Sequence, residues 1–228
     1  MYMIIEQNWH IVSIFINVQS SSVTTDFVFA WYQRVEYIES SWTQYIDTNY
    51  IPQTNTRFYI RASTKWVAEH TWLFGCRSQS SSNPFLSYIE NTYNWSSNVI
   101  RVDVNNITWD TWYRWTTNTP FTIDIDSVNR TVSVNWNIVS RYNNFTASFS
   151  SVSIWLFTMH WWWSWTMWYR FPIAWRIYEC KIYQAWILIR NYCPVYRKSD
   201  NVVWLFDSVN KVFYTNNWTW SFTKWWNI

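Results

Sequence analysis

Two neighbouring stretches of the sequence decide the fold: Ala174–Gln184, AWRIYECKIYQ, and Ile187–Tyr192, ILIRNY. In the first stretch the apolar Cys180 and Ile182 alternate with charged residues. Side chains of a β-strand point alternately to its two faces, so a period of two with β-branched and aromatic residues predicts strands. We therefore expect both stretches to be β-strands.

The same period continues along most of the 228 residues, and no stretch shows a helical period of about 3.6 residues. Short strands at regular intervals, separated by Asn, Ser, Thr and Pro, are typical of a sandwich or jelly roll. We predict an all-β fold, an antiparallel two-sheet jelly-roll sandwich. The further predicted strands are Ile4–Glu6, Ile11–Val18, Val35–Glu39, Thr56–Ser63, Trp72–Arg77, Phe85–Glu90, Val99–Val104, Trp112–Thr116, Phe121–Asp126, Thr131–Val134, Ser151–Phe157, Val203–Asp207 and Val212–Tyr214.

The Ser-rich segment Gln19–Thr25 is expected to be a linker. Residues 1–28 then form an N-terminal hairpin or arm, or the end of an upstream module, because a unit this small does not fold alone. Residues 29–228 form one main domain, and this length is within the range of single all-β sandwiches.

Composition disfavours several classes of protein. The formal net charge of +3, with 14% charged residues, is too weak and dispersed to favour binding to nucleic acid or an anionic membrane. Cys76, Cys180 and Cys193 are odd in number and lack a C-x-x-C spacing, which favours buried free thiols over a disulfide framework or a zinc site. The apolar stretch Ile11–Val18 follows an acidic residue, so no signal peptide is indicated. Polar residues interrupt Val152–Tyr169, so no membrane span is expected.

The chain contains 23 tryptophans and one glycine, whereas average usage predicts about sixteen glycines at this length. Four tryptophans follow asparagine in short gaps between apolar runs: Asn8-Trp9, Asn94-Trp95, Asn135-Trp136 and Asn217-Trp218. With glycine in place of tryptophan, each pair would be Asn-Gly, the strongest short hairpin signal. We hypothesise that most tryptophans correspond to UGA codons of a lineage that decodes UGA as glycine. The alternative is a genuine tryptophan-rich binding surface.

Three stretches carry a family resemblance. Tyr32–Tyr50, YQRVEYIESSWTQYIDTNY, is close to the family's YTRVEYIESTGTQYIDTGY. Arg176–Tyr183, RIYECKIY, is close to its RIYSCKIYD, and Leu188–Asp200, LIRNYCPVYRKSD, to its LVRDFVPVRRKSDG. On these residues the chain resembles the laminin G-like, concanavalin A-like jelly-roll domains of bacterial surface proteins and phage structural proteins.

The positions of the family's glycines support the recoding hypothesis. Two further stretches are similar to the family: Val203–Asp207, VWLFD, to its VGLYD, and Phe213–Phe222, FYTNNWTWSF, to its FYTNAGTGSF. The residues that stand where the resembled family has glycine are Trp42, Trp204, Trp218 and Trp220, and also Asn49, Asn201 and Lys211. Trp112 matches a tryptophan that the family often has, and we expect it to be genuine.

The sequence carries no catalytic motif, and we expect that the chain is not an enzyme. Glucanases of the resembled superfamily have an E-x-D-x-x-E strand, whereas Ile123–Asp126, IDID, has two aspartates and no glutamate. Those aspartates are expected on a solvated strand face or beside a hairpin. His10, His70 and His160 accompany no nucleophile motif and are expected on the surface or in loops.

The candidate ligand-binding residues are Tyr88, Glu90, Arg101 and Asp103. Alternation puts Arg101 and Asp103 on the polar face of Val99–Val104, and Tyr88 and Glu90 of the preceding strand could lie across from them. An aromatic face combined with Arg and Asp could hold a sugar by stacking and by bidentate hydrogen bonds. The alternative is a merely solvated outer face.

Calcium is the candidate cofactor, because the laminin G-like domains that the chain resembles often hold one ion at the sandwich rim. Asp103 and Asp110, on either side of an expected turn at Val104–Trp109, are the candidate ligands. The alternative is that both aspartates cap the turn.

The resemblance implies a non-catalytic module that binds carbohydrate or a cell-surface protein. Its expected setting is a bacterial surface protein or a phage tail, so it would be extracellular, on the cell surface or on the virion, with oligomerisation through a parent fibre. A purely structural fibre spacer and a divergent glycoside hydrolase are the alternatives, because such folds host many activities.

Overall fold

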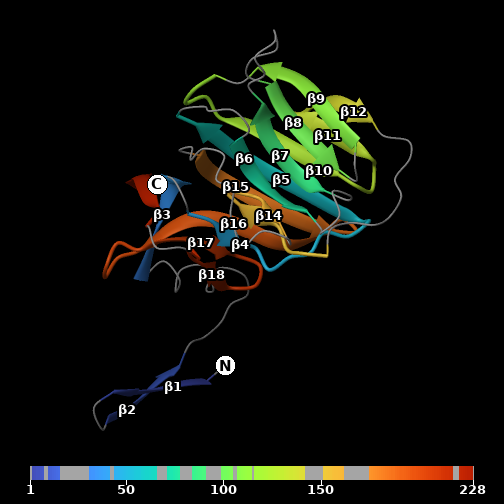
Figure 1. The fold of residues 1–228 in the computed structure, drawn as a ribbon. Coiled ribbons are helices and arrows are strands. Elements are labelled where there is room, and N and C mark those ends of the chain that lie inside the picture. Colours follow the sequence, from blue (N-terminus) through green and yellow to red (C-terminus); the bar gives the residue numbers. More distant parts are fainter. Residues whose placement is uncertain are drawn as a thin grey trace.

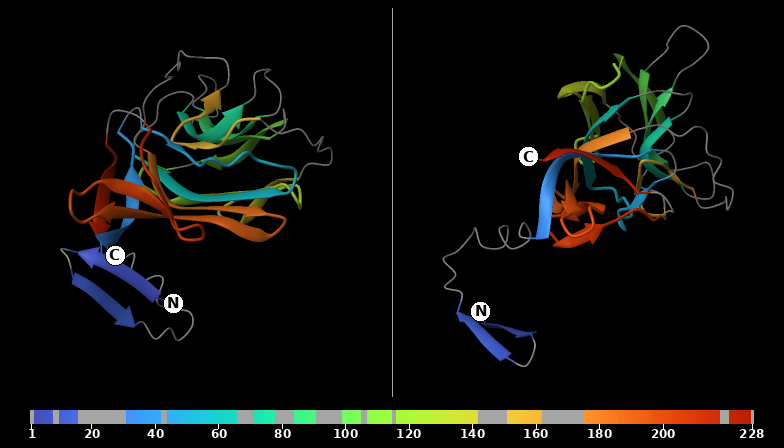
Figure 2. Two further views of the ribbon diagram at one scale, coloured as in Figure 1. Left: turned by 90° about the horizontal axis from the view of Figure 1, so that it is seen from below. Right: turned by 90° about the vertical axis from the view of Figure 1, so that its left-hand side faces the viewer.

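The computed structural model describes residues 2–7, 10–15, 31–41, 44–65, 71–77, 84–90, 99–104, 107–114, 116–141, 151–161, 175–217 and 221–227. Two large sheets form a β-sandwich (Figure 1), and Figure 2 shows them as two layers from further sides. All the described strand pairs are antiparallel except one short parallel pair between His160–Trp161 and Thr71–Arg77. The predicted all-β sandwich is therefore confirmed.

The larger sheet contains the stretches from which the fold was predicted. Its strands are β3 (Tyr32–Glu39), β5 (Thr56–Thr64), β10 (Phe121–Asp126), β11 (Thr131–Val134), β12 (Asn137–Arg141), β15 (Trp175–Gln184), β16 (Ile187–Arg197), β17 (Val203–Asp207), β18 (Val212–Tyr214) and β19 (Thr223–Asn227). Within the described residues they pair in the order β12-β11-β10-β5-β15-β3-β16-β17-β18, with β19 also on β3. Because β15 pairs with β5, β3 and β16, it lies at the centre of the sheet.

The smaller sheet packs against it. Its strands are β4 (Ile46–Asp47), β6 (Thr71–Arg77), β7 (Phe85–Glu90), β8 (Val99–Val104), β9 (Ile107–Arg114), β13 (Trp155–Leu156) and β14 (His160–Trp161). The order is β4-β13-β6-β7-β8-β9, and β14 pairs with β6. The predicted strand Ser151–Phe157 is thus reduced to the two residues of β13, which bridge β4 and β6.

Near the N-terminus, β1 (Tyr2–Gln7) and β2 (His10–Phe15) form a separate two-stranded antiparallel sheet. The division of the chain into residues 1–28 and 29–228 stays a prediction. The described part of the chain includes no helix with the length and apolar character of a membrane span.

The core lies between the two sheets and is built from the apolar positions of the alternating strands. Phe58 of β5 contacts Phe74 of β6 and Phe85 of β7, with ring centroids 4.3 and 6.0 Å apart, and all three side chains are fully buried. Full burial of one such side chain stabilises a fold by about 1.5–3 kcal/mol. These rings therefore hold the larger sheet against the smaller one.

Two turns hold tryptophan in the left-handed backbone region. Between β11 and β12, Asn135 and Trp136 have φ of 49° and 68°, and between β15 and β16, Ala185 and Trp186 have φ of 47° and 71°. Positive φ at both central residues is typical of the type I′ hairpin turn, which favours Asn-Gly. Trp136 and Trp186 are 71% and 52% exposed, so their indoles gain little from burial in return.

Candidate functional site

The predicted ligand-binding residues lie on the smaller sheet, where the register brings two of them, Tyr88 and Arg101, into one row. Tyr88 of β7 pairs with Arg101 of β8, and Arg101 pairs with Asp110 of β9. On the other side, Trp72 of β6 pairs with Tyr88. Directly paired residues share a face of the sheet, so these four positions cross β6 to β9 in a row.

The row lies on the outer face of the sandwich. Val102 is fully buried in the core, while its neighbours Arg101 and Asp103 are partly exposed. Residues two apart in a strand share a face, so Asp103 lies on the face of Arg101 and Glu90 on that of Tyr88. All four predicted ligand-binding positions therefore share the outer face, although Glu90 pairs with Val99 rather than with a polar residue.

The proposed calcium ligands are placed differently from the expectation. The turn expected between Asp103 and Asp110 is shorter, because β9 already begins at Ile107 and Asp110 lies inside that strand. In the register, Arg101 pairs directly with Asp110, and Asp103 pairs with Thr108. No group of three or more His, Cys, Asp or Glu that could hold a metal occurs among the described residues. Calcium binding stays a prediction.

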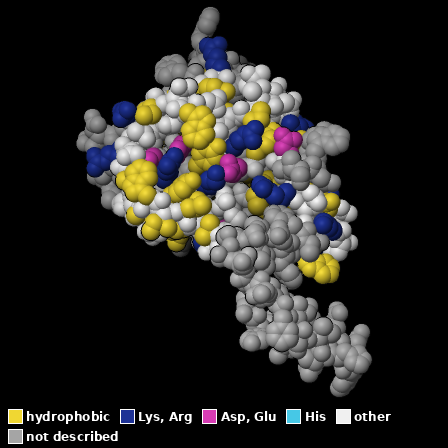
Figure 3. All heavy atoms as spheres, turned by 180° about the vertical axis from the view of Figure 1, so that it is seen from behind, with side chains coloured by type: hydrophobic (Ala, Val, Ile, Leu, Met, Phe, Trp, Pro, Cys, Tyr) yellow, Lys and Arg dark blue, Asp and Glu magenta, His cyan; other side chains and the backbone are white. Residues whose placement is uncertain are grey.

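A second set of side chains, which sequence reasoning missed, covers the outer face of the larger sheet. We call it the Tyr59 surface: Arg57, Tyr59 and Arg61 of β5, Asp124 of β10 and Lys181 of β15. Asp124 and Lys181 pair directly with Tyr59 from the two neighbouring strands. Figure 3 shows one face of the molecule on which hydrophobic side chains alternate with Lys, Arg, Asp and Glu.

The charged groups of the Tyr59 surface are held in defined positions. Arg57 donates two parallel hydrogen bonds to Asp124, Nε to Oδ1 at 3.0 Å and an Nη to Oδ2 at 2.6 Å, and this contact raises the pKa of Arg57. The Lys181 ammonium lies 5.5 Å from the centre of the Tyr59 ring. Burial raises the pKa of Tyr59, so its hydroxyl stays a neutral hydrogen-bond donor.

The indole of Trp136 covers Tyr59. The two rings stack with centroids 5.7 Å apart, and the tyrosine is only 8% exposed. The turn is fixed on β10, because the Asn135 N–H donates to the Thr122 carbonyl at 3.1 Å and the Thr122 N–H donates to Asn135 Oδ1 at 2.9 Å. The side chain of residue 136 therefore covers part of the Tyr59 ring.

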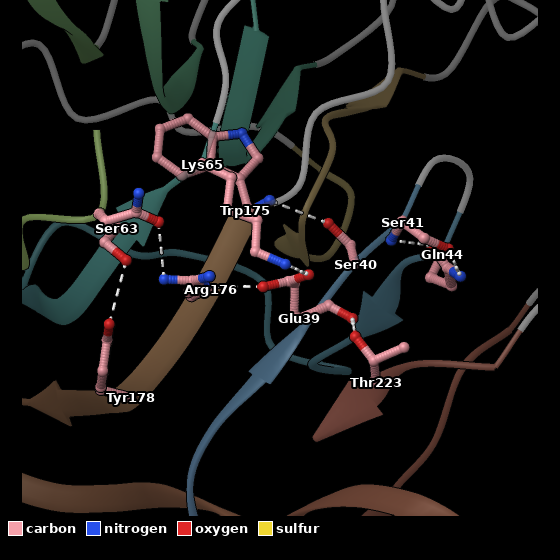
Figure 4. A network of polar contacts seen from close by, with 11 residues as sticks. Glu39, Ser40, Ser41, Gln44, Ser63, Lys65, Trp175, Arg176, Tyr178 and Thr223 are labelled. Carbon is pink, nitrogen blue, oxygen red and sulfur yellow. Dashed lines mark hydrogen bonds and ion pairs between the residues drawn. The ribbon is translucent and has the colours of Figure 1, made fainter. Parts of the chain in front are cut away.

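A buried polar cluster joins the strands of the larger sheet (Figure 4). Glu39 of β3 accepts from Arg176 Nε of β15 at 2.7 Å and pairs with Lys65 Nζ, which follows β5, at 2.6 Å. Arg176 also donates to Asn118 Oδ1 at 2.9 Å, and its guanidinium lies 4.7 Å from the Tyr37 ring centre. Because both Glu39 oxygens are engaged by cations, this cluster ties three segments together instead of offering a carboxylate to a ligand.

The aspartates of Ile123–Asp126 have structural partners and lie on a strand face and beside a hairpin, but they are not solvated as expected, because Asp126 is buried and the Asp124 side chain is only 12% exposed. Asp124 holds Arg57 on the Tyr59 surface. Asp126 accepts from the backbone N–H groups of Val128 and Asn129, both at 2.9 Å, and so caps the turn from β10 to β11.

One histidine and the cysteines can be compared with expectation. His160 is not a loose surface residue: its ring stacks on Trp155 at 4.0 Å, its Nδ1 lies 3.1 Å from the Ser153 carbonyl oxygen, and burial lowers its pKa. His70 lies outside the described residues. The three cysteines are free thiols, as predicted, with Cys76 and Cys180 buried and Cys193 only partly buried.

No protein-family model matches the chain, and no curated protein does. Among solved structures, it is similar to a proposed carbohydrate-binding protein from Bacteroides ovatus, with a TM-score of 0.54 and 9% identity, covering 84% of this chain and 60% of that one. It is also similar to domain 4 of AbnA, an extracellular GH43 arabinanase from Geobacillus stearothermophilus, in complex with arabinotriose. That match has a TM-score of 0.43 and 14% identity, covering 60% of this chain and 63% of that one. The chain thus spans about three fifths of the length of each structure, and the first match shows a shared β-sandwich fold.

Proposed function

We propose that this chain is a non-catalytic carbohydrate-binding module with its site on the outer face of the smaller sheet. The observation that carries the proposal is the row of Trp72, Tyr88 and Arg101, with Asp103 on the same face. Aromatic rings stack on the apolar faces of sugar rings, while Arg and Asp exchange hydrogen bonds with hydroxyl groups. Glu90, at the end of β7, adds an acceptor position on that face.

The similarity to the Bacteroides ovatus protein supports this proposal at the level of the fold. That protein is proposed to bind carbohydrate and shares the β-sandwich. One fold hosts many functions, so the choice of carbohydrate as the ligand rests on the row of Trp72, Tyr88 and Arg101 and not on the fold.

Three carboxylates of the larger sheet have structural partners, which favours binding over hydrolysis on that sheet. Glycoside hydrolases place two carboxylates roughly 5–10 Å apart on either side of the scissile bond. Glu39 is engaged by two cations, Asp124 by Arg57, and Asp126 by the backbone of a turn. These three groups hold the fold together.

We further propose that the domain is laminin G-like and belongs to an extracellular bacterial surface protein or a phage tail, with a parent fibre as its route to oligomers. The resemblance of Tyr32–Tyr50 and of Leu188–Asp200 supports this. The backbone adds support, because Asn49, Asn201 and Lys211, which stand at the family's glycine positions, have φ of 52°, 59° and 61°. These are positions at which glycine has no steric cost.

The same reasoning supports glycine as the natural residue at Trp136 and Trp186, through UGA codons decoded as glycine. Both lie in left-handed turns. In addition, the buried indole Nε1 atoms of Trp155, Trp175 and Trp204 have no hydrogen-bond partner within the described structure. An unsatisfied buried donor costs about 1–3 kcal/mol. Sequencing of the gene tests the proposal: we expect UGA at positions 136 and 186 and UGG at 112, and UGG at 136 and 186 would end it.

A glycan array tests the proposed function. Purified protein with glycine at positions 136 and 186 should bind at least one class of glycan. Arg101→Gln should weaken that binding about tenfold or more, because the sugar loses a charge-assisted hydrogen bond. Arg141 is an exposed arginine at the end of β12, and Arg141→Gln is the matched control. This control variant should bind the glycan as tightly as the unsubstituted protein. A folded protein that binds no glycan, or an Arg101→Gln variant that binds like the control, refutes the proposal.

A further inference from the structure

We propose that the Tyr59 surface is a second carbohydrate-binding site, on the opposite sheet from the first, and that its ligand is a glycan bearing carboxylate groups. The ligand class follows from the proposed function, and the site itself is argued from the side chains of the larger sheet. At its centre is Tyr59, the one aromatic residue of the set, between charged residues on both neighbouring strands.

The first step of the argument concerns access to the aromatic ring. Tyr59 lies on the outer face but is 8% exposed, and the Trp136 indole that stacks on it is one of the groups that cover it, together with Lys181. Trp136 has φ of 68° and is 71% exposed, so both its backbone and its surroundings suit glycine. With glycine at this position, the face of Tyr59 now covered by the indole becomes a stacking platform for a sugar ring.

The second step concerns charge. Three cations, Arg57, Arg61 and Lys181, surround Tyr59. Arg57 is paired with Asp124 and Lys181 with Glu179. Arg61 is exposed and forms no ion pair within the described structure. Glu179 lies opposite Arg61 in the register, but its carboxylate is engaged by Lys181. The planar guanidinium of Arg61, beside the Tyr59 ring, can bind a carboxylate of the ligand through two parallel hydrogen bonds.

The third step is that the surface is already organised. The Arg61 guanidinium lies 4.8 Å from the Tyr178 ring centre, and the Tyr178 hydroxyl is hydrogen-bonded to Ser63 Oγ at 3.1 Å. The fork between Arg57 and Asp124 fixes the other end of the surface. Groups held in place before binding lose little conformational entropy when the ligand arrives, which favours affinity.

The test measures binding of polygalacturonate oligosaccharides by calorimetry, with cello-oligosaccharides as the neutral comparison. Trp136→Gly should bind polygalacturonate about threefold to tenfold more tightly than the chain with Trp136, because Tyr59 is uncovered. In the Trp136→Gly protein, Tyr59→Leu should reverse this gain in affinity. Leucine keeps an apolar side chain at this position, so the sheet should still fold. Arg61→Gln should lower the affinity for polygalacturonate and make that affinity depend less on salt concentration. The affinity for cello-oligosaccharides, which carry no charge, should stay unchanged.

The outcomes separate this site from the one on the smaller sheet. If Trp136→Gly binds equally or more weakly, or if Tyr59→Leu has no effect, the Tyr59 surface is not the site. If polygalacturonate binds but only Arg101→Gln abolishes binding, this inference is wrong and the proposed function stands. If the folded protein binds neither polygalacturonate nor any glycan on the array, both fail.

Discussion

Trp186→Gly should make the protein more stable than Trp186→Ala, although both substitutions remove the same indole. Residue 186 has φ of 71° in the turn between β15 and β16. A residue with a Cβ atom pays about 1–2 kcal/mol for the left-handed conformation, whereas glycine gives the unfolded chain about 0.4–1 kcal/mol more conformational entropy. The glycine variant should therefore have the larger free energy of unfolding, by about 1 kcal/mol.

Urea denaturation of the two variants measures this difference from the transition midpoints, provided that the slopes agree. For a domain of this size, about 1 kcal/mol corresponds to a Tm difference of about 2–4 °C. Trp31 provides the matched control, because it is 66% exposed and is not among the residues with positive φ. There the order should reverse, with alanine more stable than glycine. An alanine variant at 186 that equals or exceeds the glycine variant would refute the assignment of a left-handed turn.

Three further predictions follow from the buried groups. Arg176→Met should lower the free energy of unfolding by about 1.5–3 kcal/mol, because Glu39 loses one charge-assisted hydrogen bond but keeps its ion pair with Lys65. Arg197→Met, which removes an exposed ion pair, should leave the free energy of unfolding nearly unchanged in the same assay. Burial raises the pKa of Tyr37 to about 12, so the folded protein holds this proton more tightly than the unfolded chain, whose tyrosine pKa is about 10. The free energy of unfolding should therefore fall as the pH rises from about 10 to 12. Tyr37→Phe should make that fall smaller in denaturation curves measured across this pH range. Burial also raises the pKa of Cys180, so thiol reagents should label this residue only after unfolding, and labelling of the native protein measured by mass spectrometry would contradict its placement.

The strength of the local sequence pattern decided which strands could be predicted. Val99–Val104 and Phe121–Asp126 alternate clearly and have the bounds that were expected. Asn137–Arg141, NIVSR, and Thr223–Asn227, TKWWN, were missed because neither alternates clearly between apolar and polar residues. Ile107–Arg114 was placed too late in the chain, because Asp110 suggested a turn where the structure has a strand.

The candidate sites differ in the same way. Tyr88 and Arg101 belong to adjacent antiparallel strands, so their proximity could be expected from the alternation of two neighbouring stretches. Tyr59 and Lys181 are far apart in the sequence and meet only because β15 pairs with β5. The available signal was that Arg57, Tyr59 and Arg61 occupy the outward positions of a predicted strand, but only the sheet order shows which residues lie beside them.

Positions 136 and 186 together separate the backbone argument from the binding argument. Both residues have positive φ, so glycine should relieve the turn at each. At 136, however, glycine also removes the stack with Tyr59, which is worth about 0.5–1.5 kcal/mol, so Trp136→Gly should gain less stability than Trp186→Gly. Conversely, Trp136→Gly should raise affinity for polygalacturonate and Trp186→Gly should not, because the indole that stacks on Tyr59 is that of Trp136. If both substitutions changed affinity equally, the gain would come from a general relief of strain and not from uncovering Tyr59.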